Sequence, residues 1–151
     1  PIEMKWVAKS TFFNLPLAGF LLILSRDIKL VRGVEGAGAR VYTEAAERLS
    51  TRSSVMLFPE GTRSATGELG EFKDGAFKIA IEAQAPIVPL VVHGTRDALI
   101  KHDWRFGRCN ATVRILDPIP TAGMSLDDVA ELRERVRDLI AETKAELASA
   151  A

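Results

Sequence analysis

Short apolar runs alternate along this chain of 151 residues with segments of helical periodicity, and this alternation narrows the possible folds more than any other feature. Most of the runs are β-branched or apolar and are bounded by glycine, proline or aspartate, as strands usually are. They cover Glu3–Lys9, Ile28–Arg32, Ser54–Phe58, Ile87–His93 and Ala111–Leu116. Strands that alternate with helices indicate an α/β layer architecture. We therefore predict a mixed, mostly parallel sheet that is flanked by helices.

Three segments carry the spacing of apolar residues that is typical of amphipathic helices. The first two are Gly38–Thr51 and Gly75–Gln84. The third begins near Ser125, which together with Asp128 resembles a capping box, an arrangement that satisfies the first free N–H groups of a helix. An apolar stripe then continues from residue 129 to residue 147. The C-terminal helix is therefore the most clearly marked of the three.

Length and charge set further bounds. The chain is long enough for one domain with its own core, and we predict a single domain over residues 1–151. Its 20 basic and 20 acidic residues balance, which disfavours nucleic acid as a partner. Cys109 is the only cysteine, so an intramolecular disulfide is excluded and no metal-ligand spacing is present. We expect neither a metal site nor a bound cofactor.

The most apolar stretch, Phe12–Leu24, is interrupted by Pro16 and is shorter than the about 20 residues that a membrane-spanning helix needs. Lys9, Arg26 and Lys29 flank it. Basic side chains at the edges of an apolar segment favour a helix that lies in the membrane interface. A helix packed on the sheet has the same composition, so the residues alone leave both interpretations open.

A turn of unusual composition follows the third strand, where residues 58–64 read FPEGTRS. Pro59 has no N–H to donate and ends the strand. Gly61 permits a positive φ or a close approach of the backbone to a ligand. Arg63 offers a planar fork of donors that suits phosphate oxygens, and the hydroxyl of Thr62 adds another donor. The loop is therefore a candidate anion site, although Pro-x-Gly also occurs in ordinary surface turns.

Glu60 would repel a simple anion, so its presence needs a second explanation. Its carboxylate can orient Arg63 or accept a hydroxyl group of the ligand. A polyol phosphate provides a phosphate and a hydroxyl at once, and we expect a ligand of this kind. Two further cations lie at loop ends. Lys73 precedes the helix over Gly75–Gln84, whose N-terminal amides also favour anions, and Arg32 ends the second strand.

The run Phe58–Gly94 resembles the glycerolipid acyltransferase family, which is typified by 1-acylglycerol-3-phosphate acyltransferase. Two of the family's characteristic blocks are similar to this sequence at Phe58–Ser64 and Ile87–Val91. In the family's second block, only the apolar alternation and the final arginine, Arg32, are kept. The resemblance implies an α/β fold like that of glycerol-3-phosphate acyltransferase.

The resemblance also implies a reaction, namely transfer of a fatty acyl group from acyl-CoA or acyl carrier protein to a hydroxyl of lysophosphatidic acid or a related lysophospholipid, in phospholipid biosynthesis. Together with the chemistry of the loop, it indicates six substrate-binding residues: Glu60, Gly61, Thr62, Arg63, Arg32 and Lys73. The strand at Pro89 would line the acyl or thioester side. Such substrates lie in a bilayer surface, so we expect a peripheral or monotopic position at the cytoplasmic face of a membrane.

The general base of that family is absent from this sequence. In the family a histidine deprotonates the attacking hydroxyl, and an aspartate five residues later orients the imidazole. Here Asp97 follows His93 by four residues, and Asp103 is adjacent to His102. We therefore expect no catalytic residue within this chain. Because the family places this block before its second block, we expect that the chain begins after it and is inactive alone.

Two other functions are compatible with the sequence. A lipid- or phosphate-binding module of the same fold could keep the anion loop and dispense with the base. An acyltransferase could also act on another hydroxyl or amine acceptor, although a phosphate-binding loop disfavours acceptors that lack a phosphate. The acyl chain length, the type of donor and the oligomeric state have no signature in these residues.

Overall fold

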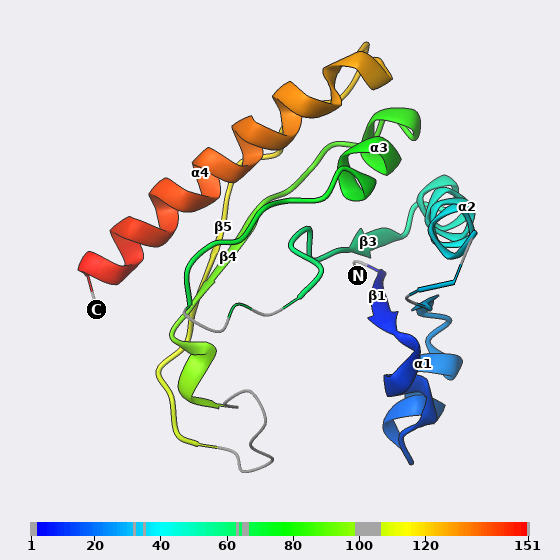
Figure 1. Cartoon of the computed structure of the whole chain (residues 1–151), viewed down its shortest axis with the longest axis horizontal. Coiled ribbons are helices and arrows are strands. Elements are labelled where there is room, and N and C mark those ends of the chain that lie inside the picture. The colour runs from blue at the N-terminus through cyan, green and yellow to red at the C-terminus, as the bar shows by residue number, and fades with distance from the viewer. Residues whose placement is uncertain are drawn as a thin grey trace. The chain divides into compact units, whose positions relative to one another are not determined.

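The computed structural model describes residues 3–31, 33–34, 36–62, 64, 67–98 and 107–150. The chain divides into two compact units, Pro1–Pro59 and Glu60–Ala151, and each is described by itself. Figure 1 shows the helices and strands of both units. The prediction of a single domain over residues 1–151 stays a prediction.

The first unit is built on a three-stranded parallel sheet in the order β2-β1-β3. Its strands are β1 (Met4–Lys9), β2 (Ile28–Leu30) and β3 (Ser54–Met56). Parallel strands need a crossover between them, and helices provide both crossovers. The helical segments are η1 (Ser10–Asn14, a 3₁₀ turn) and α1 (Ala18–Leu24) between β1 and β2, and α2 (Ala37–Ser50) between β2 and β3.

Polar side chains fix the entry of β2 into this sheet. Asp27 accepts the backbone N–H of Trp6 at 2.7 Å and the hydroxyl of Ser25 at 2.6 Å. Lys5 is buried in β1, and its ammonium group donates to the Ser25 carbonyl at 2.6 Å and pairs with Glu3 at 2.7 Å. A buried charge needs partners of this kind. The hydrogen bond from Lys5 also lowers the pKa of the Glu3 carboxyl below its ordinary value.

The second unit combines two helices with an antiparallel strand pair. Its elements are α3 (Gly75–Glu82), β4 (Leu90–His93), η2 (Thr95–Ala98), β5 (Thr112–Ile115), η3 (Leu126–Asp128) and α4 (Val129–Ser149). Figure 1 shows α4 running alongside α3 and the β4–β5 pair, and residues of α4 contact both α3 and β4. The core between them contains Phe72, Phe77, Ile81, Ile119, Val129, Leu132 and Val136.

The predicted fold class is confirmed, because parallel strands joined by helices form the first unit and an antiparallel pair completes the second. All five predicted strands exist, but several are shorter than predicted. The strand expected from Ile87 begins at Leu90 instead, since Pro89 has no N–H and interrupts the pairing. Ile87 keeps only an isolated bridge to Ile119.

The predicted capping box at the C-terminal helix is also confirmed. The Asp128 carboxylate accepts the backbone N–H of Ser125 at 2.7 Å, and the Ser125 hydroxyl oxygen accepts the N–H of Asp127 at 3.3 Å. These bonds satisfy N–H groups that have no partner within the helix itself. The helical segment begins with one 3₁₀ turn and continues as α4.

The apolar stretch Phe12–Leu24 forms two short helical segments, η1 and α1, that are separated at Pro16. Within α1 only Gly19 is buried. In the described part of the chain, no helix combines the length and the apolar character that crossing a bilayer requires. The leucine, isoleucine and phenylalanine side chains of α1 are therefore not core residues of the first unit.

Candidate functional site

The turn after β3 has the backbone that the sequence predicts. Pro59 and Glu60 form a turn, and Gly61 adopts a φ of +66°, in the left-handed region that side chains disfavour. Thr62 follows as an exposed residue. The local conformation therefore favours glycine at position 61. The strand itself ends earlier than predicted, because β3 stops at Met56, three residues before Pro59.

Glu60 is held by the backbone of a later loop. One of its carboxylate oxygens, Oε2, accepts the N–H of Gly70 at 2.8 Å in a partly buried position. A Cβ atom at Gly70 would lie 3.0 Å from that oxygen, so a glycine allows the close approach. The sequence predicts that Glu60 orients Arg63 or accepts a ligand hydroxyl, and this third role was not foreseen. No local pattern could have indicated it, because the partner is a backbone N–H ten positions away.

The loop over residues 67–74 leads from this contact into α3. Its one buried side chain is Phe72, which packs in the core of the unit and stacks on Phe77 with 6.3 Å between ring centroids. Lys73 follows as an exposed side chain, two residues before Gly75, the first residue of α3. Lys73 is therefore an exposed cation whose neighbour Phe72 is anchored in the core, and its role in binding phosphate stays a prediction.

Asp74 occupies the N-cap position directly before α3, but its side chain makes no capping hydrogen bond. No side chain caps this helix end, and Asp74 instead pairs with Arg133 at 2.5 Å and more distantly with Lys78 at 4.0 Å. The hydrogen bond to Asp74 raises the pKa of the Arg133 guanidinium above its ordinary value, so Arg133 stays charged. The Asp74 carboxylate therefore does not bind the N-terminal amides of α3, which is compatible with the predicted anion site.

The structure describes four of the six predicted substrate-binding residues: Glu60, Gly61, Thr62 and Lys73. Through Glu60 and Gly70 it brings the turn after β3 together with the loop that carries Lys73. Arg63 and Arg32 lie outside the described residues. Their predicted roles stay predictions.

The structure describes one of the two histidines, His93. His93 is the last residue of β4, half-buried, and lies opposite Thr112 of β5. His102 and Asp103 lie outside the described residues. Among the residues that the structure describes, no group of three or more histidine, cysteine, aspartate or glutamate side chains is arranged to hold a metal ion.

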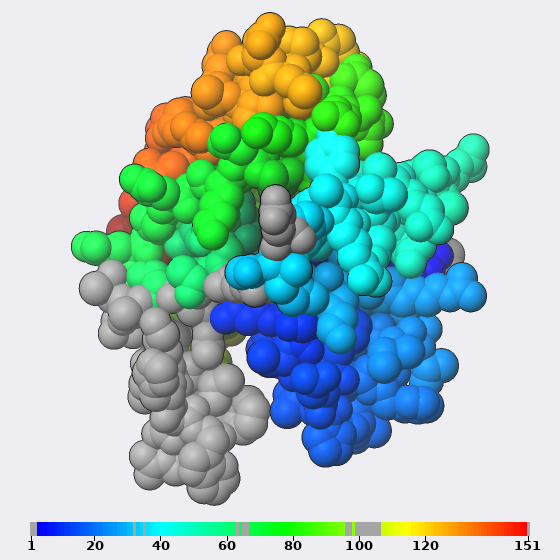
Figure 2. Space-filling model, turned by 45° about the vertical axis from the view of Figure 1, so that its right-hand side comes forward, coloured from blue at the N-terminus to red at the C-terminus, as the bar shows by residue number. Residues whose placement is uncertain are grey.

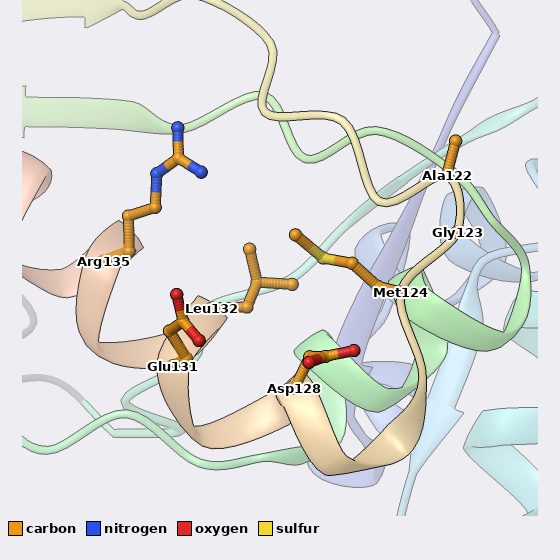
Figure 3. Close-up of a pocket in the computed structure, with 7 residues that line it drawn as sticks. All are labelled: Ala122, Gly123, Met124, Asp128, Glu131, Leu132 and Arg135. Carbon is orange, nitrogen blue, oxygen red and sulfur yellow. The ribbon is translucent and has the colours of Figure 1, made fainter.

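A pocket of about 320 Å³ lies elsewhere in the second unit, at the start of α4 (Figure 3). Its lining residues are Ala122, Gly123, Met124, Asp128, Glu131, Leu132 and Arg135. Asp128 is already engaged in the capping box, and Met124 and Leu132 pack with the core. Of the predicted substrate-binding residues, the four that the structure describes do not line this pocket, so we do not assign it to the candidate site.

Two groups of apolar side chains are exposed. The first lies on η1 and α1 and includes Phe12, Leu17, Phe20, Leu21, Ile23 and Leu24. Figure 2 shows this blue segment at the surface of the first unit. The second lies on the strand pair of the second unit, where Val92 faces Val113 across the ladder and Ile115 is also exposed. Apolar patches of this kind usually mark surfaces that bind lipid, ligand or protein.

The comparisons with known proteins agree in one family. A family model described as Acyltransferase matches residues 1–93. The human 1-acyl-sn-glycerol-3-phosphate acyltransferase alpha is 39% identical over 132 residues, which cover 87% of this chain and 47% of the human protein. The 1-acyl-sn-glycerol-3-phosphate acyltransferase of Saccharomyces cerevisiae is 34% identical over 143 residues, covering 93% of this chain and 47% of the yeast protein.

A solved structure is similar throughout the chain. The 1-acyl-sn-glycerophosphate (LPA) acyltransferase PlsC from Thermotoga maritima superposes with a TM-score of 0.81 at 27% sequence identity. The match covers 96% of this chain and 57% of the Thermotoga chain. The present chain therefore spans about half the length of the curated relatives that it matches.

Proposed function

The chain belongs to the acyltransferase family, and from that membership we propose that it is part of an enzyme that acylates a hydroxyl of lysophosphatidic acid or a related lysophospholipid. The acyl donor is a thioester, acyl-CoA or acyl carrier protein. The relatives named above carry the names of 1-acyl-sn-glycerol-3-phosphate acyltransferases, which supports this acceptor. The product is a diacylated phospholipid precursor, so the reaction belongs to phospholipid biosynthesis.

The observation that carries the proposal is the hydrogen bond between Gly70 N–H and Glu60. It joins the two segments that the sequence marks for anion binding, the turn with Gly61 and the loop with Lys73. Arg63 and Arg32 supply further positive charge for the acceptor's phosphate. Several converging cations and backbone amides are what a phosphate monoester requires.

The chemical step needs a proton acceptor. The acceptor hydroxyl oxygen attacks the thioester carbonyl and forms a C–O bond while its proton passes to a general base. The C–S bond then breaks, and the leaving thiolate takes up that proton from the base and departs as a thiol. A positioned base typically contributes about 10²–10⁴-fold to the rate of such a step. Neither His93 nor His102 has an aspartate five residues later, which is the spacing that the family uses. The 151-residue polypeptide alone is therefore expected to have no turnover.

In this proposal the acyl chain of the thioester lies along the β4–β5 strand pair of the second unit. Val92, Val113 and Ile115 are exposed there, downstream of the Pro89 that precedes β4. An aliphatic chain loses contact with water when it lies on such a surface, which favours binding in proportion to the buried area.

The membrane supplies the lysophospholipid. The exposed apolar side chains of η1 and α1, with Lys9 and Lys29 nearby in the sequence, support a peripheral or monotopic position at the cytoplasmic face. Apolar side chains flanked by basic residues bind interfaces that contain anionic lipids.

The test is an acyl-transfer assay that follows thiol release from acyl-CoA or acyl carrier protein with lysophosphatidic acid as acceptor. The product of the complete gene is assayed beside the 151-residue polypeptide. Turnover by the complete product and none by the polypeptide is the expected result. Turnover by the polypeptide that His93→Ala abolishes would make His93 the base, and no transfer to any lysophospholipid by the complete product would overturn the proposal.

A further inference from the structure

The loop over residues 67–74 carries Lys73 but contains no helix or strand. Such a loop holds a side chain in one place only if other contacts fix its backbone. One contact comes from Glu60, which accepts the N–H of Gly70 near the middle of the loop. The side chain of Phe72 adds a buried anchor. Leu69 also packs against the core, and the Gly67 N–H donates to the Ser64 hydroxyl at 3.0 Å. Side chains of α4 add further contacts at both ends of the loop.

Both ends are bound by α4. The ammonium group of Lys144 donates to the carbonyl of Gly67 at the first end. At the second end, Nη1 of Arg133 pairs with Oδ1 of Asp74 at 2.5 Å. Both partners on the loop therefore bind cationic side chains of one helix.

The spacing of Arg133 and Lys144 along α4 allows them to bind the two ends of the loop. The two residues are about three helical turns apart, so their side chains leave the same face of α4. They are separated by roughly 16 Å along the helix axis, at about 1.5 Å per residue. The short backbone between Gly67 and Asp74 spans at most roughly 25 Å when fully extended. A rigid helix thus holds the ends of the loop apart at a distance that the loop can bridge in a partly extended form.

We propose that Arg133 and Lys144 are positioning residues for the acceptor's phosphate, and that they act by fixing the loop that presents Lys73. The inference rests on the proposed function, because it takes Lys73 to bind the phosphate. It extends the binding machinery to α4 (Val129–Ser149), which lies beyond the residues 1–93 that the family model matches.

The ion pair between Arg133 and Asp74 suits positioning better than it suits stabilisation. The side chains of Arg133 and Asp74 are 28% and 43% exposed. Partly exposed ion pairs contribute little to the global free energy of unfolding, because water competes for both charges. Removing Arg133 should therefore increase the mobility of the loop over residues 67–74 while it changes the free energy of unfolding only slightly.

The experiment compares Arg133→Gln with Arg137→Gln in the product of the complete gene. Arg137 also lies on α4, and its ion pair is with its neighbour Asp138 at 4.0 Å rather than with the loop. Amide hydrogen exchange over residues 67–74 reports the loop, and acceptor KM and kcat report binding and chemistry. Lys144→Gln releases the opposite end of the loop and provides a second variant, and thermal unfolding verifies that each variant is folded.

Arg133→Gln is expected to exchange faster over residues 67–74. It should raise acceptor KM by roughly threefold to tenfold with less effect on kcat, a part of what a whole charge-assisted hydrogen bond is worth. Arg133→Lys should recover some of the loss, and Arg137→Gln should behave as the parent does.

Unchanged exchange over residues 67–74 in both Arg133→Gln and Lys144→Gln overturns the proposal. Faster exchange with unchanged KM also overturns it, and Lys73→Ala then shows which idea has failed. If Lys73→Ala raises KM, the proposed function stands and loop position is unimportant. If Lys73→Ala leaves KM unchanged, the phosphate role of Lys73 is wrong and the inference falls with it.

Discussion

The carboxylate of Glu60 accepts the backbone N–H of Gly70 at 2.8 Å, and this bond joins the turn after β3 to the loop that leads into α3. It explains how an acidic side chain can belong to a segment for which we propose anion binding. One carboxylate oxygen is directed at a backbone donor of the protein, where it organises the loop.

Removing the Glu60 carboxylate should release the Gly70 amide. Glu60→Ala is expected to speed hydrogen exchange at Gly70 and to lower the free energy of unfolding by about 0.5–1.5 kcal/mol, the usual net value of one hydrogen bond. Glu60→Gln keeps an acceptor oxygen and should retain part of the protection. Exchange measured by NMR decides the matter, and a Gly70 amide equally protected in Glu60→Ala would contradict the prediction.

Gly70→Ala tests the same contact from the other side. The added methyl group would lie 3.0 Å from Glu60 Oε2, so the side chain or the loop must shift. The shift weakens the hydrogen bond between Glu60 and the Gly70 N–H, so we expect the free energy of unfolding to fall by up to about 0.5–1.5 kcal/mol. Gly38→Ala is the control, because a methyl group there meets no atom within 4 Å and lies in α2, where alanine is favoured over glycine. Urea unfolding should show opposite shifts, and equal shifts would show that the contact at Gly70 is unimportant.

Much of the fold could be predicted from the sequence because it depends on neighbouring residues. The strands follow from local apolar runs, and the capping box at Ser125 and Asp128 depends on residues three positions apart. The contacts around the candidate site join residues that are distant in the sequence. Gly67 and Lys144 are 77 positions apart, and Asp74 and Arg133 are 59 positions apart. No periodicity or motif encodes such pairs, and only the packing of α4 on the unit reveals them.

The residue types at the candidate site were more predictable than their partners. Gly61 has the positive φ that its place in the turn indicates. The predicted role of Glu60 was incomplete. A carboxylate beside cations suggests that it binds a ligand hydroxyl or an arginine, and the sequence contains no sign that it binds a distant backbone N–H instead. The structure tests neither Arg63 nor Arg32, which lie outside the described residues.

Arg63→Ala should mainly weaken acceptor binding. A charge-assisted contact to phosphate is worth about 1.5–3 kcal/mol, which corresponds to a KM raised roughly tenfold to hundredfold. Arg63→Lys should restore only part of the loss, because an ammonium group lacks the planar fork. Steady-state kinetics of the complete gene product measure this, and an unchanged acceptor KM in Arg63→Ala would show that Arg63 does not bind the phosphate.

The exposed apolar residues of α1 should contribute to membrane binding. Phe20 and Leu21 are 62% and 55% exposed, and replacing both with serine removes apolar surface worth a few kcal/mol of lipid contact, about 25 cal/mol per Å². Flotation with anionic liposomes should fall in this double variant. Leu126→Ser removes an exposed leucine from η3 as the control. Equal flotation of the parent and the Phe20/Leu21 variant would show that α1 does not contact lipid.

Calorimetric titration of the 151-residue chain tests the proposed phosphate site most directly. Glycerol 3-phosphate is the ligand, and glycerol, which lacks the phosphate, is titrated separately as the control. The proposal assigns anion binding to Lys73, Arg63, Arg32 and loop amides, all of which this chain contains. The prediction is measurable binding of glycerol 3-phosphate, none of glycerol, and a loss of about tenfold or more in Lys73→Ala, the value of one charge-assisted hydrogen bond. Arg137→Gln removes a positive charge elsewhere on the unit and should bind as the parent does. Equal heats for glycerol and glycerol 3-phosphate, or affinity unchanged in Lys73→Ala, would contradict the account.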